Sequence, residues 1–149
     1  MKKILEKLIA KEYLTASEAE KSLIEITKGK HDDILISSFL TIFMIRSVSI
    51  DELNGFRNAL LNLCVKIDLS DYHTIDLCGT GGDEKNTFNI STLSSFVTAG
   101  AGIKVAKHGN YGVSSNCGSS NVLEFLGINF SNNESFLKSC IDKAGICFL

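Results

Sequence analysis

The residues best suited to chemistry stand in a glycine-rich stretch, GTGGDEKNTFNIST, at positions 79–92. Glycines allow the main chain to approach a phosphate closely and to point its N–H groups toward it. Asn89, Ser91 and Thr92 stand at the predicted start of a helix, where free N–H groups and the helix dipole favour an anion. Asp83 and the Ser91 hydroxyl are oxygen ligands of the kind that magnesium accepts beside substrate phosphates. The stretch favours a phosphate site, but alone it is also compatible with a simple turn, an N-cap at Ser91 and a solvated Asp83.

A second polar stretch, AKHGNYGVSSNCGSSN at positions 106–121, contains Lys107, His108 and Asn110. Two serine pairs and three glycines accompany them. The first stretch has neither the GxxxxGK[ST] nor the GxGxxG pattern of the common nucleotide-binding loops. A lone histidine is more often structural than catalytic, and a lone lysine is more often solvated. The case for a site therefore depends on whether the two stretches meet.

The elements predicted around these stretches bring them together. Short apolar runs at 73–78, 103–107 and 146–149 predict strands, and helical patterns lie between them. This alternation indicates βαβ units and a parallel sheet. Ligands bind at the carboxyl ends of such strands, and both polar stretches leave a strand at that end. We therefore expect one crevice that binds a highly phosphorylated, hydroxyl-bearing ligand.

The first 66 residues carry helical patterns only, with capping boxes at Thr15–Glu18 and Ser49–Glu52. We expect four short helices there. The predicted fold class is α/β: a small N-terminal helical domain over 1–68, followed over 69–149 by the first βαβ portion of a larger, truncated parallel-sheet α/β domain. The truncation is expected because parallel sheets are normally covered on both faces, and no helix follows the final strand.

The composition narrows the possible partners. A net charge of −2 and a pI near 5.9 leave no basic stripe for a nucleic-acid backbone. Glu6, Lys7 and Lys11 interrupt the apolar residues of the N-terminus, so no signal-peptide core is present, and no apolar run reaches transmembrane length. Five cysteines without CxxC spacing indicate reduced, mostly buried thiols. We expect a cytoplasmic protein with no nucleic-acid or membrane partner.

The paired motifs resemble those of the anthranilate phosphoribosyltransferases, a family of tryptophan biosynthesis. The resemblance is carried by GTGGD at 79–83, NIST at 89–92, KHGN at 107–110, SS at 114–115 and GS at 118–119. The segments YLTASEAE and ISSFLTIFMIRSVSIDEL resemble the small α domain of the family, so the resemblance covers essentially the whole chain. It implies transfer of the phosphoribosyl group of phosphoribosyl pyrophosphate to the anthranilate amine, with release of pyrophosphate.

The resemblance also implies site residues. It places phosphoribosyl pyrophosphate at Gly79, Gly82, Asp83, Thr87, Asn89, Ile90, Ser91, Thr92, Lys107, His108, Gly109, Asn110, Tyr111, Gly112, Val113, Ser114, Ser115 and Ser119. It places anthranilate at Gly79 and Asn110 and makes Ser91 a ligand of a Mg²⁺ cofactor. The site's task would be to position the donor and stabilise the departing pyrophosphate around an oxocarbenium-like transition state. No general base can be named from the sequence, and the family implies a homodimer through the helical domain.

Two residues depart from the family pattern: Tyr111 stands where arginine is usual, and Asn121 where aspartate is common. Family chains are also much longer. Their remaining length carries the arginine that binds anthranilate and the acidic pair that holds a second magnesium ion. We therefore expect no turnover and at most weak donor binding from these 149 residues.

Two other interpretations stay open. A pyrimidine nucleoside phosphorylase-like enzyme shares the architecture and a glycine-rich phosphate loop, although the KHGN segment argues against it. The chain could instead be a non-catalytic helical dimerisation module with a vestigial site. Cleavage of thymidine or uridine would identify the phosphorylase, and a monomer near 16 kDa in light scattering would count against the dimer.

Overall fold

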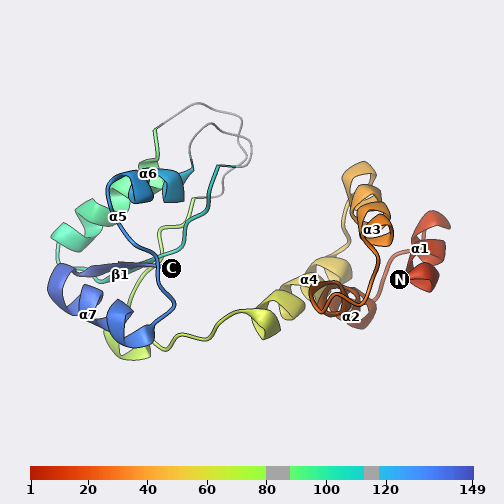
Figure 1. Cartoon of the computed structure of the whole chain (residues 1–149), viewed down its shortest axis with the longest axis horizontal. Helices are drawn as coiled ribbons and strands as arrows, with labels where there is room; N and C mark the ends of the chain where they lie inside the picture. Colours follow the sequence, from red (N-terminus) through yellow and green to blue (C-terminus); the bar gives the residue numbers. More distant parts are fainter. Residues whose placement is uncertain (80–87, 113–117) are drawn as a thin grey trace. The chain divides into compact units, whose positions relative to one another are not determined.

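The computed structural model describes residues 1–79, 88–112 and 118–149. The chain forms two compact units, Met1–Val65 and Lys66–Leu149, called here the helical unit and the α/β unit (Figure 1). The mixed α/β class, with a helical N-terminal part and a parallel sheet after it, is confirmed. The domain limits at 68 and 69 stay a prediction.

The helical unit contains the four expected helices: α1 (Lys2–Ile9), α2 (Ala16–Thr27), α3 (Asp33–Ile45) and α4 (Ile50–Leu63). Both predicted capping boxes are confirmed. The Thr15 side chain accepts from the Glu18 N–H at the start of α2, and the Ser49 side chain accepts from the Glu52 N–H at the start of α4. Each box satisfies main-chain N–H groups that have no partner within their helix.

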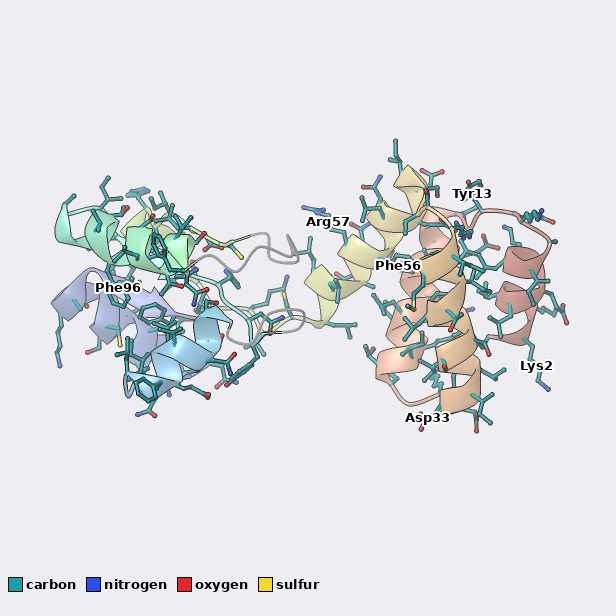
Figure 2. The ribbon with its side chains drawn as sticks, turned by 90° about the horizontal axis from the view of Figure 1, so that it is seen from above. Lys2, Tyr13, Asp33, Phe56, Arg57 and Phe96 are labelled. Atoms are coloured by element: carbon teal, nitrogen blue, oxygen red, sulfur yellow. The ribbon has the colours of Figure 1, made fainter. Side chains whose placement is uncertain are left out.

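Aromatic packing joins α3 to α4. The Phe39, Phe43 and Phe56 rings lie edge to face, with centroids 4.9 to 6.2 Å apart, in a core that also contains Leu5, Leu8, Leu14 and Ala19. Figure 2 labels Phe56 among the helices of this unit. The helices α2 and α4 pack more closely still at Gly55, where a Cβ atom would come within 2.7 Å of the Ala19 Cβ. This helix pair therefore depends on a position without a side chain.

The α/β unit contains a 3₁₀ turn (Ser70–Tyr72), α5 (Ile90–Gly100), β1 (Val105–Lys107), α6 (Ser119–Phe125), α7 (Glu134–Ala144) and β2 (Ile146–Phe148). The strands β1 and β2 are parallel, with Ala106 opposite Cys147. These two residues pack with Leu137 and Ile141 of α7. On the other face Phe148 contacts Phe96 of α5, with ring centroids 5.7 Å apart. Because side chains alternate across a strand, α5 and α7 cover opposite faces of the pair (Figure 1).

Three sequence-based expectations need correction. The strand predicted over 73–78 is a single parallel bridge between Ile75 and Val105, because side chains replace the next main-chain partners, as described below. Ser131 and Glu134, three residues apart, predict a helix capped at Ser131, but the N-cap of α7 is Asn133, whose side chain accepts from the Phe136 N–H. Of the four cysteines in the described ranges, all are free, but Cys64 and Cys78 are exposed rather than buried. Among the described helices, none has the length and apolarity needed to span a bilayer.

Candidate functional site

The first polar stretch meets α5 at the Gly79–Ser91 contact. A Cβ atom on Gly79 would lie 3.2 Å from the Ser91 Oγ, so the absence of a side chain allows this approach. Asn89, and not Ser91, is the N-cap of α5, and its side chain makes no cap bond within the described part of the chain. The first-turn N–H groups of α5 are therefore not capped by a side chain from these residues. Such groups, together with the helix dipole, favour an anion.

Thr92 provides an independent sign of a missing partner in the same turn. Its side chain is 5% exposed, and its Oγ1 atom has no hydrogen-bond partner in the part of the chain that the structure describes. A buried hydroxyl without a partner costs free energy, so native structures rarely retain one without a role. This observation is consistent with the expected contact of Thr92 with a polar ligand.

The second polar stretch begins at the end of β1 with a buried cation. Lys107 is 1% exposed, and its ammonium donates to the carbonyl oxygens of Leu77 (3.1 Å) and His108 (3.0 Å). Among the described residues no carboxylate lies within ion-pair distance of this ammonium. A buried charge needs compensation from dipoles or anions, and the two carbonyl dipoles supply it here. The Lys107 ammonium thus holds the starts of both polar stretches together and adds positive charge there.

His108 is held by a residue that sequence reasoning missed. The Asp76 carboxylate accepts from the His108 main-chain N–H (3.1 Å) and contacts the ring Nδ1 at 3.0 Å. The one signal that could have found Asp76 is its place, a carboxylate in the second half of the strand predicted over 73–78 and three residues before Gly79. The His108 side chain remains 62% exposed, so its other ring nitrogen can reach solvent or a ligand.

The start of α6 closes the base of the second stretch. Asn110 N donates to the Ser119 Oγ (3.1 Å), and Asn110 O accepts from the Ser120 N–H (3.1 Å). A Cβ atom on Gly118 would lie 2.5 Å from Asn110 O, so the glycine permits this close approach. Asn121 Oδ1 accepts from the N–H groups of Gly112 (3.0 Å) and Gly118 (2.9 Å), one on each side of residues 113–117.

Tyr111, which departs from the family pattern as Asn121 does, turns toward α6. Its hydroxyl donates to the Glu124 carboxylate at 2.5 Å, and this bond raises the pKa of Tyr111 above its ordinary value. Tyr111 and Glu124 line a hollow of about 440 Å³, together with Ile128, Asn129 and Phe130. Tyr111 and Asn121 therefore each have a structural partner or role.

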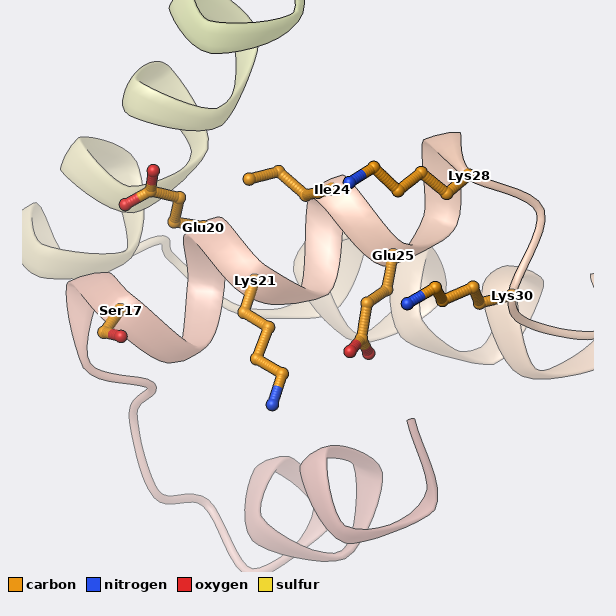
Figure 3. Close-up of a pocket in the computed structure, with 7 residues that line it drawn as sticks. All are labelled: Ser17, Glu20, Lys21, Ile24, Glu25, Lys28 and Lys30. Atoms are coloured by element: carbon orange, nitrogen blue, oxygen red, sulfur yellow. The ribbon is translucent and has the colours of Figure 1, made fainter.

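A second hollow, of about 260 Å³, lies in the helical unit along α2 (Figure 3). Its lining consists of Ser17, Glu20, Lys21, Ile24, Glu25, Lys28 and Lys30. Glu25 contacts His31 at 3.1 Å, and Glu20 accepts from Asn62 at 2.9 Å. The Glu20 and Glu25 carboxylates thus already bond to neighbouring side chains. The lining contains no glycine and none of the predicted site residues.

The structure thus brings together two subsets of the predicted site residues. Gly79 meets Ser91, and Asn110 meets Ser119, while Lys107 and His108 bond to residues just before Gly79. Gly82, Asp83, Thr87, Val113, Ser114 and Ser115 lie outside the described residues. The described part contains no cluster of three metal-ligating His, Cys, Asp or Glu residues. The Ser91 hydroxyl fits a Mg²⁺ ion that keeps mainly phosphate and water ligands.

Comparison with known proteins covers both units. A glycosyl transferase family model for the helical bundle domain matches residues 2–64, and one for the a/b domain matches residues 71–149. The anthranilate phosphoribosyltransferase of Flavobacterium johnsoniae is 68% identical over all 149 residues, which span 45% of that relative. The chain therefore spans less than half the length of the curated relatives that it matches.

Solved structures give the same result. The anthranilate phosphoribosyltransferase of Thermus thermophilus matches with a TM-score of 0.81 and 30% identity over 97% of this chain and 44% of its own. That of Saccharomyces cerevisiae, in complex with PRPP and Mg, matches with a TM-score of 0.81 and 26% identity over the same shares. The resemblance expected from the motifs is thereby confirmed. The chain belongs to the glycosyl transferase family, with the family's helical bundle domain at residues 2–64 and its a/b domain at residues 71–149.

Proposed function

We propose that this chain provides the helical domain and two donor-binding loops of an anthranilate phosphoribosyltransferase. One observation carries the proposal: both polar stretches leave parallel main chains at their carboxyl ends, and the second stretch is bonded there to the residues that lead into the first. Lys107 reaches the Leu77 carbonyl, and His108 reaches the Asp76 carboxylate. The 68% identity to a relative of that name indicates the chemistry that the paired loops serve.

In the proposed reaction, the anthranilate amine forms a bond to the anomeric carbon of the donor ribose. The bond from that carbon to pyrophosphate breaks, and the bonding pair leaves with pyrophosphate. The first turn of α5, with Gly79, Ser91 and Thr92, would hold the departing group through main-chain N–H groups and hydroxyls. His108 through Gly112 and Ser119 would close over the same donor, with Asn110 and Gly79 against anthranilate. No described residue is assigned as a general base.

Magnesium is part of the proposal. The yeast relative's structure contains PRPP and Mg, and the Ser91 hydroxyl, which lies beside Gly79, is the ligand that the family resemblance implies. The ion would neutralise charge on the departing pyrophosphate. We expect Ser91→Ala to raise the KM for the donor and the magnesium requirement together.

The test uses a completed chain, meaning this sequence followed by the part of the Flavobacterium johnsoniae relative that the sequence does not match. We expect it to release pyrophosphate only when anthranilate, phosphoribosyl pyrophosphate and Mg²⁺ are all present. The 149-residue chain alone serves as the comparison, and we expect it to give no turnover. Phosphorolysis of thymidine or uridine by the completed chain would instead support the nucleoside phosphorylase interpretation.

The assembly and location of the protein are also proposals. A homodimer through the helical unit is supported by apolar side chains exposed on α3 and α4, which are Ile34, Leu40, Met44, Ile45, Ile50, Leu53 and Leu60. A cytoplasmic location follows from the sequence expectation, and fractionation of cells with an antibody to this chain would test it.

A further inference from the structure

The parallel pairing beside β1 stops after one bridge, where both polar stretches begin. Ile75 N donates to Lys104 O, and Ala106 N donates to Ile75 O, each at 3.0 Å. The Ala106 N–H is donated by the 103–108 segment. In a regular parallel ladder the next N–H donated by that segment would be that of His108, to the Leu77 carbonyl. In the structure, each of these two groups is bonded to a side chain instead.

Asp76 and Lys107 supply the replacements. The Asp76 Oδ1 accepts from the His108 N–H at 3.1 Å, in place of the Leu77 carbonyl. The Lys107 ammonium donates to the Leu77 carbonyl at 3.1 Å, in place of the His108 N–H. This exchange satisfies both main-chain groups, as folded proteins require, and it allows the two main chains to separate into loops.

We propose that Asp76 is a positioning residue of the site, which fixes His108 and the loop that His108 begins. Both of its carboxylate oxygens are used on that one residue, Oδ1 on the main-chain N–H and Oδ2 on the ring Nδ1 at 3.0 Å. Two contacts to one residue define its position and the orientation of its ring. An asparagine side chain offers only one oxygen, so it can reproduce only one of the two acceptor contacts.

The position of His108 controls the predicted donor-binding residues that follow it. Gly109 approaches Ser119 so closely that a Cβ atom would lie 2.6 Å from the Ser119 Oγ. Asn110 then bonds to Ser119 and Ser120 at the start of α6. A displacement of His108 would therefore move Gly109 and Asn110 relative to Ser119. What these residues bind rests on the proposed function, whereas the clamp on His108 does not.

The first measurement tests the clamp without any ligand. In the 149-residue chain, we expect Asp76→Ala to lower the hydrogen-exchange protection of the His108 N–H by about tenfold or more, because its acceptor is lost. The Ala106 N–H, which bonds to Ile75, should keep its protection and so report that the strands remain paired. Asp76→Asn keeps an oxygen for the His108 N–H and should preserve its protection within about threefold. Asp71→Asn, which removes a nearby exposed carboxylate, is the matched control.

The second measurement tests the consequence for binding in the completed chain. We expect Asp76→Ala to raise the KM for phosphoribosyl pyrophosphate about tenfold or more and to change kcat by less than about threefold, since binding is lost in the ground and transition states alike. Asp76→Asn should raise this KM by about threefold, and Asp71→Asn should leave it unchanged. A partial rescue by the asparagine is the result that distinguishes clamping from general destabilisation.

Two results would overturn the proposal: unchanged protection of the His108 N–H in Asp76→Ala, or a donor KM within about twofold of the parent in both Asp76 variants. If Asp76→Ala does not fold, the asparagine variant decides by its KM. If the parent completed chain gives no anthranilate-dependent pyrophosphate release, the proposed function is wrong, and the exchange measurement alone decides whether Asp76 fixes His108.

Discussion

Thr92, a residue of the first turn of α5 that is 5% exposed, has a buried hydroxyl group with no hydrogen-bond partner among the described residues. If an oxygen of bound phosphoribosyl pyrophosphate accepts from this hydroxyl, the unsatisfied hydroxyl lowers stability only in the free protein. We predict that Thr92→Val stabilises the free 149-residue chain by about 1 kcal/mol, because it replaces an unsatisfied buried hydroxyl by a methyl group of similar size. The midpoint of urea unfolding measures this.

The same variant should weaken donor binding in the completed chain, raising the KM for phosphoribosyl pyrophosphate about fivefold through the lost hydrogen bond. Thr98→Val, in the same helix, is the matched control and should leave this KM unchanged. A Thr92→Val variant with the parent's stability and KM would show that the hydroxyl has neither the cost nor the role assigned to it.

Glu52 carries a charge inside the helical unit, because its side chain is 0% exposed. Burial alone would raise its pKa, but hydrogen bonds from Arg46 and from the Leu14 and Ser49 N–H groups outweigh burial and lower the pKa from 4.5 to about 2. The Arg46 guanidinium lies over the Tyr13 and Phe43 rings, 4.9 and 4.7 Å from their centroids. The Glu52 carboxylate therefore joins Leu14, in the loop before α2, to Ser49 at the start of α4.

A lowered folded-state pKa makes the helical unit sensitive to acid. The stabilisation from ionised Glu52 is complete above pH 4.5 and is lost as the pH falls toward 2. We predict that Glu52→Gln destabilises the helical unit by about 3 kcal/mol at pH 7 and flattens the pH dependence of stability between pH 4.5 and 2. Urea unfolding followed by circular dichroism checks this, with Glu6→Gln at an exposed position of α1 as control. A parent and a Glu52→Gln variant with the same stability at pH 7 would contradict the assignment.

At the scale of elements, α2 and α4 come into close contact at Gly55. A Cβ atom there would meet the Ala16 carbonyl and lie 2.7 Å from the Ala19 Cβ, and the backbone carbonyl cannot move aside as a flexible side chain could. Alanine is intrinsically the better helix former, by about 1 kcal/mol. Packing and propensity thus predict opposite effects of the same substitution.

We predict that packing dominates and that Gly55→Ala destabilises the helical unit by about 1 to 3 kcal/mol. Gly100→Ala in α5 is the matched control, because nothing lies within 4 Å of a Cβ atom there. That variant should be neutral or stabilising by up to about 1 kcal/mol. Thermal unfolding of both variants measures the difference, and a stabilising Gly55→Ala would show that the helix pair is looser than described.

The elements also show which predictions local sequence could support. A capping box joins residues three apart in the chain, so Thr15–Glu18 and Ser49–Glu52 were predictable, and both are confirmed. The strand at 73–78 was not predictable in its extent. Its pairing ends where Asp76 and Lys107, far apart in the chain, exchange main-chain partners.

At the scale of the whole molecule, exposed apolar area on α3 and α4 indicates a partner surface. Met44 is 84% exposed and Ile45 79% exposed, while Phe39 of the same helix is buried. The helix α3 is therefore core on one side and exposes apolar side chains on the other. Apolar surface of this kind is typical of protein interfaces.

We predict that the 149-residue chain forms a homodimer through this surface, with a mass of twice 16.2 kDa, about 32 kDa, in light scattering. Met44→Glu should shift it to the monomer, because burying a charge at an interface is costly. Ser17→Glu adds the same charge at an exposed position of α2, a helix that carries none of these exposed apolar residues, and should leave the dimer intact. A parent chain that is monomeric at all concentrations tested would contradict the proposed dimer.

The sequence by itself determined the features that depend on local spacing or on whole motifs. These are the four N-terminal helices, the two capping boxes, the parallel α/β class and the family that carries GTGGD, NIST and KHGN together. Such features follow from interactions within a few residues or from patterns that relatives share.

Only the tertiary structure decided how distant residues meet. It showed that the buried Lys107 ammonium bonds to the Leu77 carbonyl and that Asp76 holds His108. It also showed that Asn121 accepts from both Gly112 and Gly118. The reason is physical: a buried polar group takes the nearest partner that the packed chain offers, and that partner is set by three-dimensional proximity rather than by spacing along the sequence.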